Sequence, residues 1–248
     1  VNEKLTVGLG VGYAQDTTNI GTDGFRSQSK GYSLALYGSY MPGDDLFVEG
    51  LLGIGGFDFD TRRYVQPVDD FALSARKGYQ YFGSIGGGYE WRGKTTMLSP
   101  YARIEFSSDR LGESSETGAS YYALTYFEQA AASMQGVLGL RGESIHATPF
   151  GFVVPRARLE WRQDLRESSE ANIAYADQVG GTRYSISPSG SLRSALVWGI
   201  GSEFLFRNGW SLGLDYQLSR VSASESSFAL RAKVTKELGA KGLPKLLQ

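Results

Sequence analysis

The alternation of apolar and charged residues is clearest between residues 155 and 162. In this stretch every second residue is apolar, and the residues between them are Arg156, Arg158, Glu160 and Arg162. Successive side chains of a β-strand point to opposite faces of a sheet, so the stretch predicts a strand with one apolar and one ionic face. Residues 100–106 repeat the order Pro-x-Ala-Arg-(Ile/Leu)-Glu-(Phe/Trp) in the same phase. The repetition indicates a structural rule that several strands share.

The same period-two pattern recurs along the chain and predicts ten strands. They cover residues 5–14, 32–40, 46–55, 79–91, 98–106, 132–141, 155–162, 196–206, 210–219 and 228–235. Long polar connections are expected at 16–30, 61–77, 107–120 and 166–185, with solvated charges such as Arg63 inside them. Short turns are expected at 41–45, 92–94, 142–151 and 207–209. If neighbouring strands are antiparallel, all long connections lie at one end, which is typical of bacterial outer-membrane barrels and unexplained in a soluble β-sandwich.

The polar phase of the strands carries too many ionised groups for a dry core, because each would need nearly complete pairing to offset its desolvation. Its charged members are Glu49, Glu90, Arg103, Glu105, Arg141, Arg156, Arg158, Glu160, Arg162, Glu203 and Arg231. A water-filled lumen removes that cost. We therefore predict that these residues line the lumen of an all-β, antiparallel, up-and-down transmembrane β-barrel, mainly as a structural ladder of ion pairs.

The opposite phase is aliphatic in the middle of the strands and aromatic near their ends. The aromatic positions are Tyr13, Tyr40, Tyr89, Trp91, Phe106, Trp161, Phe206 and Trp210. Aromatic side chains gather at the membrane interfaces on both sides of a lipid-facing band. This phase is therefore expected to face lipid.

Composition adds exclusions to this picture. The chain has 248 residues, 41% of them hydrophobic, a mean hydropathy of −0.25 and no apolar run of helix-spanning length, but barrel strands give only a weak hydropathy signal. A net charge of −1 gives no reason to expect nucleic-acid binding, and the absence of cysteine excludes disulfides and thiolate metal sites. His146 is the single histidine and lies in an expected turn, so we expect no metal, no cofactor and no catalytic residue.

Several segments together resemble the β-domain of autotransporters of type V secretion. They are residues 5–13, 32–40, 47–60, 100–106, 138–143, 155–165 and the Leu-Gly-Leu-Asp-Tyr sequence at 212–216. The resemblance implies an outer-membrane translocator and anchor that is not an enzyme and assists the surface export of an N-terminal passenger. It implies as partners the passenger with a helix threaded through the lumen, outer-membrane lipid and lipopolysaccharide, and the barrel-assembly machinery. The family barrel has twelve strands, so this chain is expected to begin at the third.

The expected organisation is one barrel domain over residues 1–238 and a tail over 239–248. Two other functions stay open at this point. One is a ten-stranded outer-membrane protease of the omptin kind, which needs a histidine with acidic partners at the outward rim. The other is a passive pore.

Overall fold

Strand pairing, not a buried apolar core, organises the molecule. The computed structural model describes residues 4–21, 23–178, 180–186, 193–221 and 226–236. Ten strands form one antiparallel sheet in chain order. They are β1 (Leu5–Ile20), β2 (Phe25–Tyr40), β3 (Leu46–Val65), β4 (Asp70–Tyr89), β6 (Thr96–Leu111), β9 (Gln129–Ser144), β11 (Gly151–Ser169), β14 (Ser194–Phe206), β15 (Trp210–Arg220) and β16 (Ser226–Lys236).

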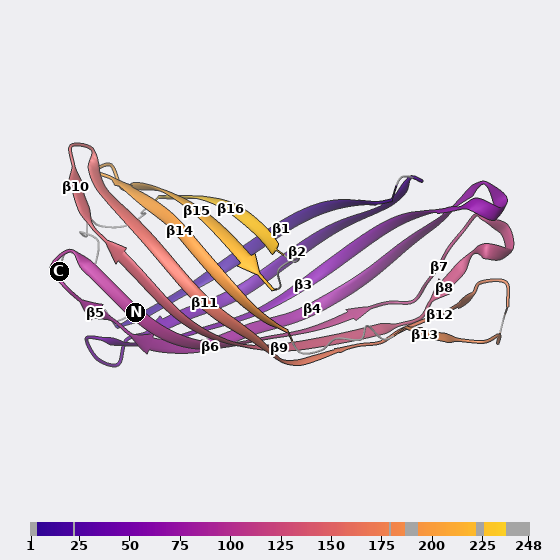
Figure 1. Ribbon diagram of the computed structural model, residues 1–248, viewed down its shortest axis with the longest axis horizontal. Coiled ribbons are helices and arrows are strands. Elements are labelled where there is room, and N and C mark those ends of the chain that lie inside the picture. The colour runs from indigo at the N-terminus through magenta and orange to yellow at the C-terminus, as the bar shows by residue number, and fades with distance from the viewer. Residues whose placement is uncertain (1–3, 22, 179, 187–192, 222–225, 237–248) are drawn as a thin grey trace.

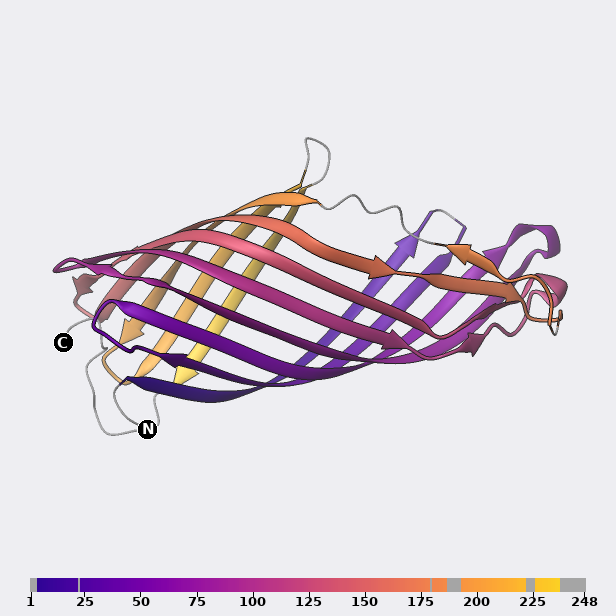
Figure 2. The same ribbon diagram turned by 90° about the horizontal axis from the view of Figure 1, so that it is seen from below.

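The sheet curls about one axis, as Figures 1 and 2 show. Two short strands extend its rim: β5 (Trp91–Arg92) pairs with β6, and β10 (His146–Thr148) pairs with β11. Within the described residues, β1 pairs with β2 alone and β16 with β15 alone. The tail expected at 239–248 lies outside the described residues.

The prediction of ten antiparallel strands is confirmed, but several predicted boundaries are wrong. Residues 16–30 are not a polar connection, because β1 and β2 continue to the pair Ile20 and Phe25. Most of 61–77 likewise belongs to β3 and β4, joined by the 3-10 helix η1 (Gln66–Val68). Beyond the lipid both faces of a strand meet water, so the apolar alternation ends while the backbone pairing continues.

Three further predicted segments also differ from the structure. The strand expected at 79–91 is interrupted at Glu90, between β4 and β5, and the turn expected at 142–151 contains β10. Strand β11 continues past residue 162 to Ser169 with a register shift between Asp164 and Arg166. A β-bulge of this kind adds one residue to one strand of the pair and keeps the sheet intact.

The two longest excursions fold into a second sheet at the far end of the long strands. Its order is β13 (Tyr184–Ile186), β12 (Ala171–Tyr175), β8 (Leu124–Tyr126) and β7 (Ser114–Ser115), with the 3-10 helix η2 (Ser120–Tyr122) beside it. A bridge between Leu73 and Thr117 joins it to β4. The short turns lie at the opposite end of the main sheet (Figures 1 and 2).

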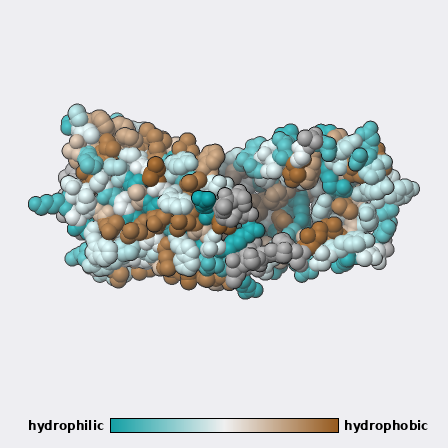
Figure 3. All heavy atoms as spheres, viewed as in Figure 1, coloured by the Kyte–Doolittle hydropathy of each residue, from teal (hydrophilic) through white to brown (hydrophobic). Residues whose placement is uncertain are grey.

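Large apolar side chains lie on the outside of the curled sheet. Leu9, Leu52, Ile85, Ile200 and Leu230 are each more than 60% exposed, whereas the largest fully buried side chain is Glu160. Hydrophobic residues cover much of the half with the short turns, and the end with the second sheet is mostly hydrophilic (Figure 3). Within the described ranges no helix is both long and apolar enough to cross a membrane.

Glycines on the inner face make room for aromatic rings from the next strand. The Tyr101 ring lies over Gly139, where a Cβ would overlap it, and Phe82 lies over Gly53 in the same way. Consecutive Gly86, Gly87 and Gly88 let the carbonyl groups of neighbouring strands approach closely. This fits the interpretation of the glycine run as close backbone packing on a strand.

Candidate functional site

The centre of the inner face is built around Glu160. In register, Gly139 on β9 lies between Tyr101 on β6 and Glu160 on β11. Because Gly139 has no side chain, the Tyr101 hydroxyl reaches across β9 and donates to Glu160 Oε1 at 2.5 Å. A bulkier residue at position 139 would separate the two groups.

Three guanidinium groups surround the Glu160 carboxylate, which is fully buried. Arg162 donates to Oε2 from Nη2 at 2.6 Å and from Nε at 2.9 Å. Arg103 Nη2 and Arg158 Nε each lie 3.7 Å from Oε1. A buried carboxylate is tolerated only with this kind of charge-assisted pairing.

The network extends to both neighbouring carboxylates on the same face. Arg103 Nη2 lies 2.6 Å from Glu105 Oε1, and its Nη1 lies 4.0 Å from Glu49 Oε1. Arg162 Nη1 lies 3.9 Å from Glu105 Oε2. We call Glu49, Tyr101, Arg103, Glu105, Arg158, Glu160 and Arg162 the central network, which links β3, β6 and β11.

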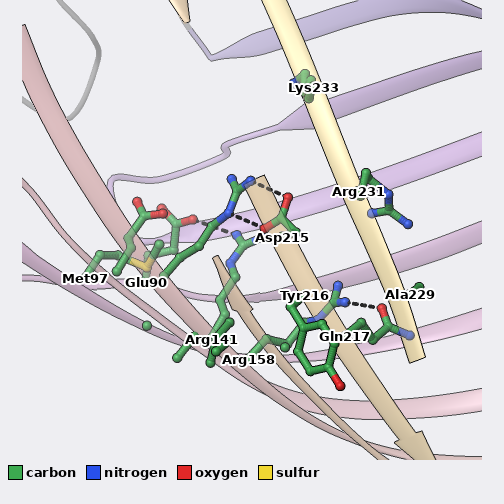
Figure 4. A pocket seen from close by; sticks show the side chains of 16 residues that line it. Glu90, Met97, Arg141, Arg158, Asp215, Tyr216, Gln217, Ala229, Arg231 and Lys233 are labelled. Atoms are coloured by element: carbon green, nitrogen blue, oxygen red, sulfur yellow. Dashed lines mark hydrogen bonds and ion pairs between the residues drawn. The ribbon is translucent and has the colours of Figure 1, made fainter. Parts of the chain in front are cut away.

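A second group of charges lines a cavity nearer the short turns, with a volume of about 500 Å³ (Figure 4). Arg141 Nη2 donates to Glu90 Oε1 at 3.0 Å, and Arg92 also pairs with Glu90. Arg156 binds Asp215 through two hydrogen bonds, from Nε at 2.8 Å and from Nη2 at 2.7 Å. One set of pairs ties β9 to Glu90, between β4 and β5, and the other ties β11 to β15.

Strand β16 contributes two cations to the same cavity, Arg231 and Lys233. Figure 4 shows both residues on β16, next to the strand that carries Asp215. Asp215 is the register neighbour of Arg231, yet its carboxylate is bonded to Arg156 on β11. Among the residues that the structure describes, neither Arg231 nor Lys233 has an acidic partner within ion-pair distance.

The eleven predicted lumen charges therefore share one face, and all except Arg231 take part in ion pairs. Besides those above, Glu203 Oε2 lies 3.7 Å from Arg156 Nη1. The prediction did not include Tyr101, Glu143, Asp215, Gln217 and Lys233, which lie on the same face. Each of them falls in the polar phase of its own strand, and that position in the alternation is the signal that could have identified them.

The eight predicted aromatic positions all carry exposed side chains on the outer face. Tyr40, Tyr89, Trp91, Phe206 and Trp210 lie near the short turns, where the rings of Tyr89 and Trp91 are 5.8 Å apart. Tyr13, Phe106 and Trp161 lie farther along their strands. The structure adds Tyr32, Tyr79 and Tyr81, which share their phase and were not predicted.

His146 lies in β10 at the short-turn end of the sheet, where its Nε2 is 3.0 Å from Ser144 Oγ. This is the end opposite to the rim where an omptin-like protease would need a histidine with acidic partners. In the described ranges no group of three or more His, Asp or Glu side chains could hold a metal ion.

Comparisons with known proteins agree with this architecture. The autotransporter β-domain family model matches residues 1–217. The translocator domain of NalP from Neisseria meningitidis superposes with a TM-score of 0.76 at 18% identity, covering 94% of this chain and 75% of that one. The β-domain of the Bordetella autotransporter BrkA gives 0.69 at 16% identity, covering 94% and 84%. None of the curated proteins matches.

The family match covers most of the chain, and the two solved structures share its curled antiparallel sheet. The chain therefore belongs to the autotransporter β-domain family, the outer-membrane translocator domains of type V secretion.

Proposed function

We propose that this domain anchors an N-terminal passenger in the outer membrane and holds the segment leading to that passenger inside its charged lumen. The observation that carries the proposal is the cavity bounded by β9, β11, β14, β15 and β16, with two cations on β16 that have no acidic partner among the described residues. The opposite wall already neutralises its own charges through the central network. Among the described charges that line the cavity, only Arg231 and Lys233 on β16 and Glu143 on β9 form no ion pair, so the cations available to a bound segment lie on β16.

The charges around the cavity define the guest that would fit. Its lining carries three acidic side chains and five basic ones, Arg141, Arg156, Arg158, Arg231 and Lys233. The surplus of two positive charges favours a segment that presents carboxylates toward β16, because complementary charge fixes the register of a bound partner. A helix is our preferred form of this segment, since it satisfies its own backbone groups within the lumen.

We further propose that the barrel domain extends over residues 1–238, and that its aromatic positions contact outer-membrane lipid and lipopolysaccharide at the two interfaces. Assembly would use the barrel-assembly machinery. No nucleic-acid partner is proposed, because the chain has a net charge of −1. We propose no catalytic step, since the site is made of mutually paired charges and not of a nucleophile with a base.

Planar-bilayer conductance tests the proposal against a passive pore. The domain is reconstituted alone and fused to the upstream segment encoded with it. A translocator that holds this segment conducts less when fused, and Arg231→Gln with Lys233→Gln should restore part of the conductance. Lys94→Gln, an exposed charge in a short turn, is the control and should restore none. Equal conductance of the two reconstituted forms would contradict the proposal.

A further inference from the structure

An apolar groove of about 480 Å³ lies on the outer face across β2, β3 and β4. Its walls are Tyr32, Leu34, Ile54, Tyr79 and Tyr81. Gly56 forms the floor, because its register neighbours are Tyr32 on one side and Tyr79 on the other. The missing side chain at Gly56 leaves the groove open between the two aromatic residues.

The groove lies at the border of the lipid-facing band nearest the long strand ends. On β4, Tyr89 marks the border near the short turns and Tyr79 lies ten residues away. At about 3.3 Å per residue and a barrel tilt of about 40°, this distance is about 25 Å of height, the usual height of the apolar band. The long ends of such barrels face the cell exterior, so the groove meets the outer leaflet.

Three cations stand directly beyond the groove on the same outer face. Lys30 lies two residues before Tyr32 on β2, and Lys77 lies two residues before Tyr79 on β4, so each is on the same face as its tyrosine and nearer the long strand ends. Arg110 on β6 is the register neighbour of Tyr79. All three are exposed. Lys77 lies 3.7 Å from Asp58 and Arg110 lies 3.9 Å from Glu128, both in exposed pairs that are worth little. The cations thus remain available to a stronger anion.

The turn that joins β2 to β3 at the other border is acidic. It carries Asp44 and Asp45, and the Tyr89 hydroxyl donates to Asp45 Oδ2 at 2.7 Å. The next turn at that border, residues 92–94, carries Arg92 and Lys94, but it lies beside β6 and away from the groove. The three cations beside the groove point to an anionic headgroup in the outer leaflet.

We propose that the groove with Lys30, Lys77 and Arg110 is a binding site for one phosphorylated lipopolysaccharide molecule. An acyl chain lies over Gly56 between Tyr32 and Tyr79, and the glucosamine phosphates meet the three cations. Basic side chains recognise lipid phosphates by charge-assisted hydrogen bonds, and aromatic side chains favour the interface. The inference rests on the outer-membrane location and not on passenger export.

Binding of purified protein in zwitterionic micelles to bisphosphorylated lipid A tests the site. Lys30→Gln/Lys77→Gln/Arg110→Gln should weaken binding at least about tenfold, given the contribution of each basic residue near a charged lipid surface. Gly56→Leu should weaken it without any change of charge, because a Cβ at Gly56 meets only a carbonyl oxygen at 3.9 Å and a side chain can occupy the groove. Lys94→Gln/Arg207→Gln/Lys236→Gln removes three exposed cations from the short-turn end of the sheet and is the matched control.

The proposal is overturned if the Lys30/Lys77/Arg110 variant binds lipid A as well as the unchanged protein does, or if the control at the short-turn end loses as much. Equal binding of dephosphorylated lipid A, or of phosphatidylglycerol, would also overturn it. Gel mobility with and without heating checks that each variant is folded. Passenger export is expected to survive the Lys30/Lys77/Arg110 variant, so failure of this site and failure of the proposed export function are distinguishable.

Discussion

At the scale of single residues, Glu160 concentrates the charge pairing of the inner face. It is fully buried, accepts a hydrogen bond from Tyr101 and lies within 4.0 Å of three arginines. Its removal would leave Arg103, Arg158 and Arg162 facing one another without the carboxylate that holds them together. Uncompensated buried charge is one of the few causes of large destabilisation by a single substitution.

Glu160→Ala is expected to lower the free energy of unfolding by about 3–5 kcal/mol, the usual result of breaking a buried ion pair. Glu203→Ala is the control, because Glu203 is partly exposed and its partner Arg156 keeps Asp215. It should cost only about 0–1 kcal/mol. Urea unfolding of the domain in detergent micelles measures both, and equal losses would contradict the assigned role of Glu160.

At the scale of elements, strands β3 and β4 continue past the apolar band and support the second sheet. Arg63, which was expected in a solvated loop, lies in β3 and donates to Glu116 at 3.0 Å from Nε and at 2.6 Å from Nη2. The Glu116 hydrogen bond raises the pKa of Arg63. Glu116 also accepts from the Leu124 N–H and the Tyr126 hydroxyl. One carboxylate thus ties β3 to β7 and β8.

Glu116→Ala should release residues 112–127 from β3 and leave the main sheet folded, because Arg63 and the Leu124 N–H lose their common partner. Limited proteolysis of the folded protein should then cut within this stretch several times faster. Glu113 is exposed and directly precedes β7. Glu113→Ala should therefore leave the rate of proteolysis unchanged. Unaltered cutting of the Glu116 variant would show that other contacts hold the sheet.

Asp70 gives the same region a pH dependence. The backbone N–H groups of Phe71 and Ala119 donate to its carboxylate and lower its pKa. A lowered folded-state pKa contributes stability that is present above the unfolded value and is lost as pH falls through the folded value. Protection of the Ala119 amide from hydrogen exchange should therefore decrease below about pH 4. The Asp70→Ala variant should lack this change, and protection that is constant down to pH 2 would contradict it.

At the scale of the whole molecule, two aromatic borders enclose an aliphatic outer surface. Trp91 and Trp210 lie at the border near the short turns, and Trp198 lies on β14 eight residues before Phe206, between Leu159 and Leu218 in register. In a bilayer this order places Trp198 at the depth of the acyl chains and the other two at the headgroups.

Brominated acyl chains should therefore quench Trp198 more strongly than Trp91. The measurement uses variants that keep one tryptophan each, with the remaining tryptophans replaced by phenylalanine, reconstituted in vesicles with bromine near the chain ends. Trp210 serves as a second interfacial reference. Quenching that is equal at all three positions would contradict the assigned lipid-facing band.

The sequence alone determined which residues share a face. The period-two alternation identified the ten strands, the charged inner phase and the aromatic outer phase, because that alternation follows directly from strand geometry. The alternation did not predict the strand residues Asp16, Arg63 and Ser107. At these positions water on both faces removes the apolar signal, although the strands continue.

Only the tertiary structure decided which charges meet. The contact of Tyr101 with Glu160 depends on a glycine in an intervening strand, and Arg231 has no acidic partner among the described residues because Asp215 binds Arg156. The groove over Gly56 likewise needs three strands in one register. Alternation specifies the face of a residue within its own strand, whereas the register between strands, set by many distant contacts together, specifies its neighbours.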